Sequence, residues 1–203
     1  MVKKTIVIAT RMSQLALWQA NWVGRSLCAK HHGLKYELLP IITSADKHEK
    51  PLQNLGGKGL FVKAVQDAVL ENKADLAVHS AKDLPCVTVD GLVLAAVPTR
   101  FFVEDVLVAK DKLQALPYGS IIATGSPRRA TQLKFLRNDL IIKPIRGNVP
   151  TRLEKYKNGE CHGLVLAKAG LDRLGLIEHA VEVFSPENIV PAAGQGSLAI
   201  ECR

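Results

Sequence analysis

The chain has 203 residues, 47% of them hydrophobic, and its 27 lysines and arginines exceed its 19 acidic residues to give a formal charge of +8. This composition is typical of a globular protein with one large or two small domains, and it excludes a disordered or fibrous chain. No apolar run approaches the ~20 residues of a membrane helix, and the start does not suit a signal peptide. We therefore expect a cytoplasmic protein.

Short β-rich runs alternate with helical patterns along the chain, which predicts an α/β fold with largely parallel strands. A strand over 5–10 precedes a helix over 13–30. The apolar stripe of that helix, which we expect to face the core, consists of Leu15, Trp18, Trp22 and Leu27. The further predicted elements, in chain order, are strand 36–42, helix 59–71, strands 76–79, 92–97, 106–109 and 121–124, helix 127–137, strand 141–145, helix 150–157, and strands 164–167 and 197–202.

Two breaks in this alternation predict two lobes. Pro98 cannot donate to a sheet, so the chain is expected to cross to a second lobe there. A second break before the last strand predicts a return to the first lobe. The two crossings predict a hinged cleft and mostly parallel sheets with one crossing strand each. Domain 1 is expected to comprise residues 1–98 and 190–203, and domain 2 residues 99–189.

Small residues and arginines occupy the turns after several predicted strands. In open α/β sheets ligands bind at such turns, and helix N-termini there favour anions. In the turn over 124–129, Ser126 suits the N-cap and Pro127 the first helical position. Arg128 and Arg129 follow in the first turn, where positive charge opposes the helix dipole. Either they bind an anion or this is a solvated basic helix start.

The same construction recurs at Arg11, at residues 56–59 and at Arg146 with Arg152. Arginine is favoured for bidentate capture of carboxylates or phosphates, so the repeated turns indicate one ligand with several negative charges. The glycine-rich segment 56–59 does not fit the phosphate-loop pattern. With the polar stretch before it, we expect a basic, mobile lid over residues 43–58.

Asp83 is the only acid among basic neighbours after the strand over 76–79. It is either an ion-pair partner for Lys82 or an arginine, or a carboxylate that stabilises a developing cation or moves a proton. No histidine spacing indicates a metal site. No CxxC pair indicates zinc among the cysteines, which are Cys28, Cys86, Cys161 and Cys202.

A set of motifs in fixed order, from about Ile6 to Arg203, resembles the porphobilinogen deaminases (hydroxymethylbilane synthases). The motifs lie at residues 8–11, 15–19, 56–61, 77–83, 126–129, 146–148, 151–153, 169–175 and 194–196. The resemblance implies a transferase of haem biosynthesis that condenses four porphobilinogen units into hydroxymethylbilane and releases ammonia. It implies a covalently bound dipyrromethane cofactor as primer, and two domains built like type II periplasmic binding proteins.

The resemblance also implies roles for individual residues. Asp83 would be the catalytic group, beside the pyrrole nitrogens. The residues implied in substrate binding are Arg11, Gln19, Lys58, Phe61, Arg146, Arg152, Arg173 and Gln195. Those implied in cofactor binding are Ser80, Lys82, Asp83, Thr124, Ser126, Arg128, Arg129 and Arg146.

The family continues into a third domain whose loop cysteine forms the thioether to the cofactor, and no cysteine of this chain lies in that context. We expect the 203-residue chain alone to carry no covalent dipyrromethane and to turn over no porphobilinogen, while binding polycarboxylate pyrroles weakly. A non-catalytic polycarboxylate-binding module of the same fold is the alternative. A nucleic-acid-binding protein is a third possibility, which aromatic residues at 5% do not favour. We expect a monomer that binds porphobilinogen, with neither nucleic acid nor membrane as partner.

Overall fold

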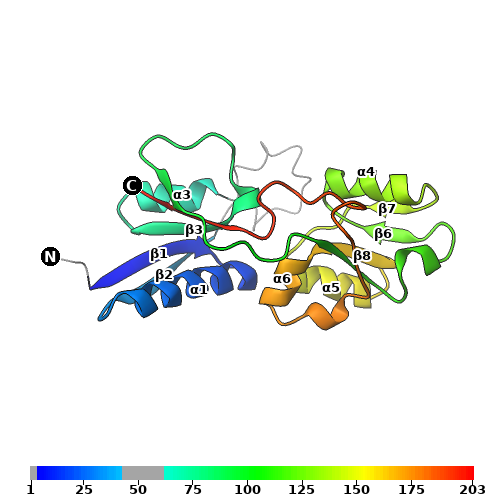
Figure 1. The fold of residues 1–203 in the computed structure, drawn as a ribbon, viewed down its shortest axis with the longest axis horizontal. Helices are drawn as coiled ribbons and strands as arrows, with labels where there is room; N and C mark the ends of the chain where they lie inside the picture. Colours follow the sequence, from blue (N-terminus) through cyan, green and yellow to red (C-terminus); the bar gives the residue numbers. More distant parts are fainter. Residues whose placement is uncertain (1–3, 43–61) are drawn as a thin grey trace. The chain divides into compact units, whose positions relative to one another are not determined.

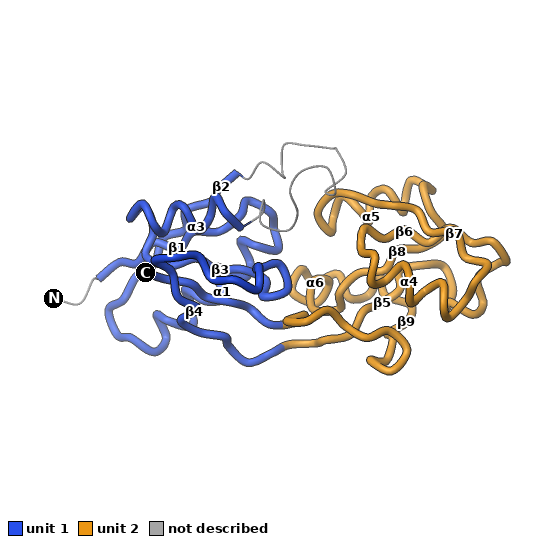
Figure 2. The backbone as a smooth tube through the Cα atoms, turned by 90° about the horizontal axis from the view of Figure 1, so that it is seen from above, with its two compact units in different colours: residues 1–100, 197–203 blue, residues 101–196 orange. Residues whose placement is uncertain are grey.

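The computed structural model describes residues 4–42 and 62–203. The chain forms two compact units (Figure 2). Unit 1 comprises Met1–Arg100 and Ser197–Arg203, and unit 2 comprises Phe101–Gly196. The domain boundaries expected from the sequence need correction, because residues 99 and 100 belong to unit 1 and residues 190–196 to unit 2. No helix in the described part of the chain has both the length and the apolar character needed to cross a membrane.

Unit 1 is built on a five-stranded sheet in the order β2-β1-β3-β10-β4 (Figure 1). Strand β1 is parallel to β2 and β3, whereas β10 is antiparallel to β3 and β4. The returning segment therefore enters the sheet against the direction of its neighbours. The elements of unit 1 are β1 (Thr5–Arg11), α1 (Gln14–Lys30), β2 (Lys35–Ile41), α3 (Lys63–Leu70), β3 (Leu76–Ser80), β4 (Val93–Ala96) and β10 (Leu198–Cys202).

Helices α1 and α3 cover opposite faces of the unit 1 sheet. Ala20 and Val23 of α1 pack with Ile8 of β1, whereas Val65 of α3 packs with Ala9, the next residue of the same strand. Because successive side chains of a strand point to opposite faces, the two clusters lie on the two sides of the sheet.

The apolar stripe predicted for α1 is confirmed in part, because Trp22 and Leu27 pack against the core cluster around Ile8. Ser13 caps the helix as expected, since its Oγ accepts the Ala16 N–H at 3.3 Å. However, the buried face contains Ala20 and Gly24, and the expected core residues of the stripe are only partly buried. A Cβ on Gly24 would lie 2.4 Å from the ring of Tyr36 on β2, so this face needs small residues for close packing and the large side chains lie at its margins.

Unit 2 repeats the layered plan with a sheet in the order β7-β6-β8-β5-β9. Strand β6 is parallel to β7 and β8, and β5 is antiparallel to β8 and β9. In each sheet the first strand after the chain crosses between units, β10 in unit 1 and β5 in unit 2, runs antiparallel to its neighbours. This confirms the prediction of mostly parallel sheets with one crossing strand each. The elements of unit 2 are β5 (Asp105–Ala109), β6 (Ile121–Ala123), α4 (Pro127–Leu136), β7 (Ile141–Lys143), α5 (Val149–Lys157), β8 (Gly163–Ala167), α6 (Lys168–Arg173) and β9 (Glu182–Val183).

Helices α4 and α5 cover opposite faces of the unit 2 sheet. Leu133 of α4 packs with Leu107 of β5, and Leu153 of α5 packs with Val106, the preceding residue of that strand. Helix α4 follows β6 along the chain. The predicted arginine turn, which contains the first residues of α4, therefore lies at the carboxyl end of β6.

Candidate functional site

The turn after β6 forms as the sequence predicts. Ser126 is the N-cap of α4, and its Oγ accepts the Arg129 N–H at 3.4 Å, with Pro127 at the first helical position. Thr124 is buried, and its Oγ1 accepts the Ser126 N–H at 3.2 Å. A Cβ on Gly125 would lie 2.9 Å from the carbonyl oxygen of Ile145, so this position needs a glycine. The first turn of α4 thus starts from a rigid, tightly packed loop.

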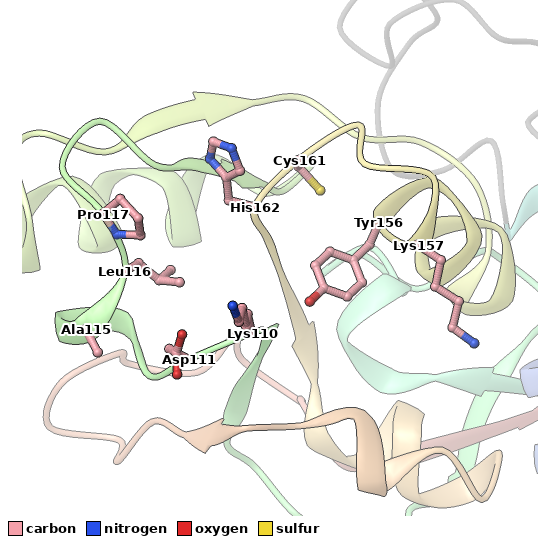
Figure 3. A pocket seen from close by; sticks show the side chains of 9 residues that line it. All are labelled: Lys110, Asp111, Ala115, Leu116, Pro117, Tyr156, Lys157, Cys161 and His162. Carbon is pink, nitrogen blue, oxygen red and sulfur yellow. The ribbon is translucent and has the colours of Figure 1, made fainter.

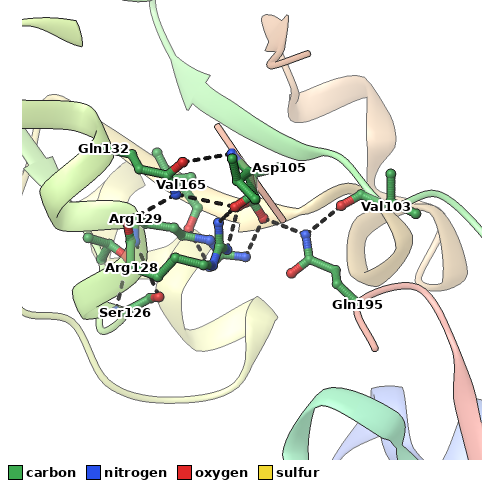
Figure 4. A network of polar contacts seen from close by, with 10 residues as sticks. Val103, Asp105, Ser126, Arg128, Arg129, Gln132, Val165 and Gln195 are labelled. Atoms are coloured by element: carbon green, nitrogen blue, oxygen red, sulfur yellow. Dashed lines mark hydrogen bonds and ion pairs between the residues drawn. The ribbon is translucent and has the colours of Figure 1, made fainter. Parts of the chain in front are cut away.

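The two arginines of this turn are not a solvated face. Both donate to Asp105 at the start of β5, Arg128 through Nη2 to Oδ2 and Arg129 through Nη2 to Oδ1, each at 2.6 Å (Figure 4). Asp105 is fully buried, and only 8% of the Arg129 side chain is exposed. The alternative of a solvated basic helix start is therefore wrong, and the partner of both arginines is an acid outside their own stretch of sequence.

Gln195 and Val190, which lie in the segment leading back towards β10, complete this arrangement. The Nε2 of Gln195 donates to Asp105 Oδ1 at 2.9 Å and to the Val103 carbonyl at 2.7 Å. The carbonyl of Val190 accepts from Nη1 of Arg128. Burial raises the pKa of Asp105, but the hydrogen bonds and charges of Arg129 and Arg128 outweigh it and hold that pKa below its ordinary value. Asp105 is therefore an anion at neutral pH.

The turn after β7 carries the second pair of arginines. Asn148 caps α5, with its Oδ1 accepting the Thr151 N–H at 2.9 Å, and Gly147 has a positive φ of 110°. Nε of Arg152 donates to the Gly147 carbonyl at 2.8 Å. Among residues 4–42 and 62–203, none makes a hydrogen bond or ion pair with the side chain of Arg146. The Arg146 guanidinium can therefore bind an anion without first breaking a bond to the described residues.

Arg173 on α6 lies inside unit 2. Its side chain is buried, Nη2 donates to the Gly196 carbonyl at 2.8 Å, and the guanidinium lies 4.9 Å from the ring centroid of Phe101. Burial lowers the pKa of Arg173, and the charge of Asp172 opposes this effect. These contacts hold Arg173 against the end of unit 2, and its role in substrate binding stays a prediction.

In unit 1, β3 ends at a short 3-10 turn, Ala81–Asp83, that carries the predicted catalytic carboxylate. Asp83 is exposed, and no described residue donates a hydrogen bond to it or forms an ion pair with it. The structure therefore does not support the alternative of an ion pair with Lys82 or an arginine. Directly before the turn, Ser80 is fixed by Gln19, whose Nε2 donates to Ser80 Oγ at 2.9 Å.

The remaining predicted site residues of unit 1 lie at the end of β1, in the 3-10 turn and outside the described residues. Arg11 is the last residue of β1, at the carboxyl edge of the sheet, and is partly buried. Lys82 belongs to the same 3-10 turn as Asp83. Lys58, Phe61 and the lid expected over 43–58 lie outside the described residues.

Sequence reasoning missed a buried polar cluster behind the Asp83 turn. His79 on β3 faces Glu201 on β10, with 3.0 Å between Nε2 and Oε2, and Nε2 of Gln66 lies 3.0 Å from each carboxylate oxygen. Burial raises the pKa of Glu201, but His79 and Gln66 outweigh it and leave that pKa below its ordinary value. Because its members are far apart in sequence, only the sheet register brings them together.

A depression of about 520 Å³ lies at the other edge of the unit 2 sheet (Figure 3). Lys110 follows the end of β5 and His162 precedes β8, and these strands are antiparallel. The depression is therefore at the amino ends of β6 and β8, opposite the arginine turns. Cys161 also lines it, and burial raises the pKa of this thiol.

Residues 6–203 match the family model described as porphobilinogen deaminase, dipyromethane cofactor binding domain. The chain belongs to the porphobilinogen deaminase family. The match covers both units and every residue singled out above. The resemblance on which the residue roles rest is thus confirmed at the level of the family, while the role of each residue remains a prediction.

Solved structures of periplasmic binding proteins share the fold of this deaminase-family chain. The methionine-binding protein MetQ is 14% identical with a TM-score of 0.59, and the match covers 98% of this chain and 83% of MetQ. A periplasmic substrate-binding protein of an ABC transporter from Coxiella burnetii is 13% identical with a TM-score of 0.55, covering 98% and 84%. The VFT2 domain of Bordetella pertussis BvgS is 14% identical with a TM-score of 0.53, covering 98% and 80%. These similarities confirm the predicted fold of the type II periplasmic-binding-protein kind.

Proposed function

We propose that this chain carries the substrate and cofactor residues of a hydroxymethylbilane synthase, which joins four porphobilinogen units head to tail and releases ammonia at each step. The observation that carries the proposal is the carboxylate of Asp83. It lies in a family motif on a short turn, is exposed, and has no hydrogen-bond or ion-pair partner among the described residues. Its place at the carboxyl end of β3, where α/β proteins bind ligands, and within the family motif is what points to a role in the reaction.

The residues of unit 2 fit the carboxylates of a dipyrromethane. Arg128 begins a helix whose N-terminal N–H groups favour anions, its side chain is 26% exposed, and Ser126 and Thr124 line the same turn. Arg146 follows the neighbouring strand with a guanidinium that no described residue engages. In unit 1, Ser80 and Lys82 are the residues that the family resemblance implies in cofactor binding. When bound, dipyrromethane supplies the primer to which porphobilinogen units are added.

Asp83 would stabilise charge during each addition. As ammonia leaves porphobilinogen, positive charge develops on the pyrrole, and a carboxylate beside the ring nitrogen lowers the energy of that state. The 3-10 turn fixes the backbone that carries Asp83, because the Leu84 N–H donates to the Ala81 carbonyl at 3.2 Å. A group fixed before the reaction loses little energy to reorganisation as the charge develops.

The remaining arginines would select a substrate with carboxylates. Arg11, Arg146 and Arg152 follow strands β1 and β7 at carboxyl edges of the two sheets, which is where α/β proteins bind ligands. Charge-assisted bonds from guanidinium groups to carboxylates are among the stronger hydrogen bonds in proteins. We therefore propose that these arginines hold the acidic side chains of porphobilinogen and of the growing chain.

The test is consumption of porphobilinogen by the protein expressed from its complete open reading frame. The Asp83→Asn variant keeps the size of the side chain and removes its charge, and we expect turnover to fall by about a hundredfold or more. Asp90→Asn, which removes another exposed carboxylate from unit 1, is the matched control and should leave turnover unchanged. An Asp83→Asn protein within a factor of two of wild type would refute the catalytic role.

A non-catalytic binding module is the second candidate, because the similar solved structures named above are binding proteins. The same assay separates the two functions. A module would bind porphobilinogen without consuming it, and Asp83→Asn would then have no turnover to change.

A further inference from the structure

The two arginines of the α4 turn both bind Asp105, but they differ in burial and in their other hydrogen-bond partners. Arg129 is buried, and its guanidinium donates to both Asp105 and the Val165 carbonyl, the latter at 3.1 Å. The Arg128 side chain is 26% exposed, and its two terminal nitrogens are bonded to Val190 and Asp105. No described residue accepts a hydrogen bond from Nε of Arg128. Arg128 is thus the arginine of the pair that can reach a ligand.

The charges of this cluster do not cancel. Two guanidinium groups face one carboxylate, so one net positive charge remains. Asp105 and Arg129 are both buried, and a buried charge is stable only when it is paired. The unbalanced charge therefore lies on the exposed member, Arg128, and matches a single carboxylate.

We propose that Asp105 is a positioning residue that holds the Arg128 guanidinium to receive one carboxylate of a pyrrole ligand, and that Gln195 in turn holds Asp105. This inference rests on the proposed function. Both donor hydrogens of the Gln195 amide are used, one on Asp105 and one on Val103, and the side chain is buried. Gln195 therefore has no side-chain N–H left to donate to a ligand, and in this proposal it acts through Asp105.

Two physical effects of Asp105 oppose each other, and this makes the proposal testable. As a negative charge near the ligand, Asp105 repels a carboxylate and weakens binding. As a fixed acceptor, it holds Arg128 in one conformation, so less side-chain entropy is lost when a ligand binds. Positioning predicts weaker binding when Asp105 is removed, whereas the charge effect predicts tighter binding.

The experiment measures binding of porphobilinogen to the 203-residue chain by calorimetry. In Asp105→Asn the positioning contact is lost, and we expect affinity about tenfold weaker than wild type. The double variant Asp105→Asn/Arg129→Gln has the same net charge at the cluster as wild type and leaves no buried guanidinium unpaired. It should fold and show the same loss. Gln195→Met, which changes no charge, should weaken binding in the same direction.

Asp139→Asn is the matched control. Asp139 pairs with Arg137 in the same unit, with Nη2 and Oδ2 2.5 Å apart, so its loss should lower the melting temperature while leaving porphobilinogen affinity within twofold. Unchanged or tighter binding by the double variant would overturn the positioning role. If the wild-type chain does not bind porphobilinogen, this inference fails, while the turnover assay described above decides the proposed function separately. If wild type binds and the variants match it, only this inference fails.

Discussion

Replacing Gly196 by alanine should destabilise unit 2 by about 3 kcal/mol, because this buried glycine leaves no room for a Cβ. Gly196 has a positive φ of 87°, which costs a residue with a Cβ about 1–2 kcal/mol. The added Cβ would also lie 2.5 Å from the Phe102 carbonyl oxygen and 2.8 Å from that of Phe101. These are backbone atoms that cannot rotate away, and overpacking of this kind costs about 1–3 kcal/mol.

The control is Gly159→Ala, because Gly159 in the same unit has a φ of 78° but nothing within 4 Å of its Cβ position. It should lose only about 1 kcal/mol. Urea unfolding followed by circular dichroism gives the stabilities. Both tryptophans lie in α1 of unit 1, so their fluorescence reports on the unfolding of that unit. In Gly196→Ala, the urea midpoint measured by fluorescence should therefore shift less than the midpoint measured by circular dichroism. Equal losses for the two glycine variants, to within about 0.5 kcal/mol, would refute the steric argument.

Two further predictions concern buried ionised groups. Because the pKa of Glu201 is lowered in the folded state, its carboxylate stabilises unit 1 fully above the ordinary value of 4.5, and this contribution is lost as pH falls through the lower native pKa. The urea midpoint of wild type should therefore fall more steeply than that of Glu201→Gln on acidification from about pH 6 to about pH 3, and equal slopes would contradict the shift. Arg173→Met should cost about 2 kcal/mol by removing the charge-assisted bond to Gly196. In a double-mutant cycle with Phe101→Leu, the ring contact should appear as a coupling of about 0.5–1 kcal/mol, and zero coupling would show that it contributes nothing.

The sequence predicted most of the regular elements because alternation and helical spacing record burial directly. It did not predict α6, which follows β8 without a loop. The N-cap of α6 is Ala167, the last residue of β8, and an alanine side chain cannot cap a helix. It also missed β9, which has only two residues. The small residues of the buried α1 face were missed for a different reason, since close contact between Gly24 and Tyr36 is a property of two packed elements and not of one helix.

The candidate site was predictable where one turn contains all its parts. Ser126 and Pro127 start α4 as expected because capping is local chemistry. The partner of Arg128 and Arg129 was not predictable, because Asp105 begins an otherwise apolar strand and becomes their neighbour only through the pairing of β5 with β8. Residues 190–196 were assigned to the first domain for the same reason, since their contacts with unit 2 are long-range.

The position of β10 between β3 and β4 in the unit 1 sheet determines the order in which the chain can fold on the ribosome. Strand β4 pairs only with β10 among the described strands, and β10 begins at Leu198. Unit 1 therefore cannot close its sheet until β10 has been synthesised, although it also contains β1. Unit 2 is continuous in sequence and is complete once Gly196 has left the exit tunnel. Vectorial synthesis usually lets the N-terminal domain fold first, but here the second unit is complete first and the N-terminal unit must wait with an open edge at β3.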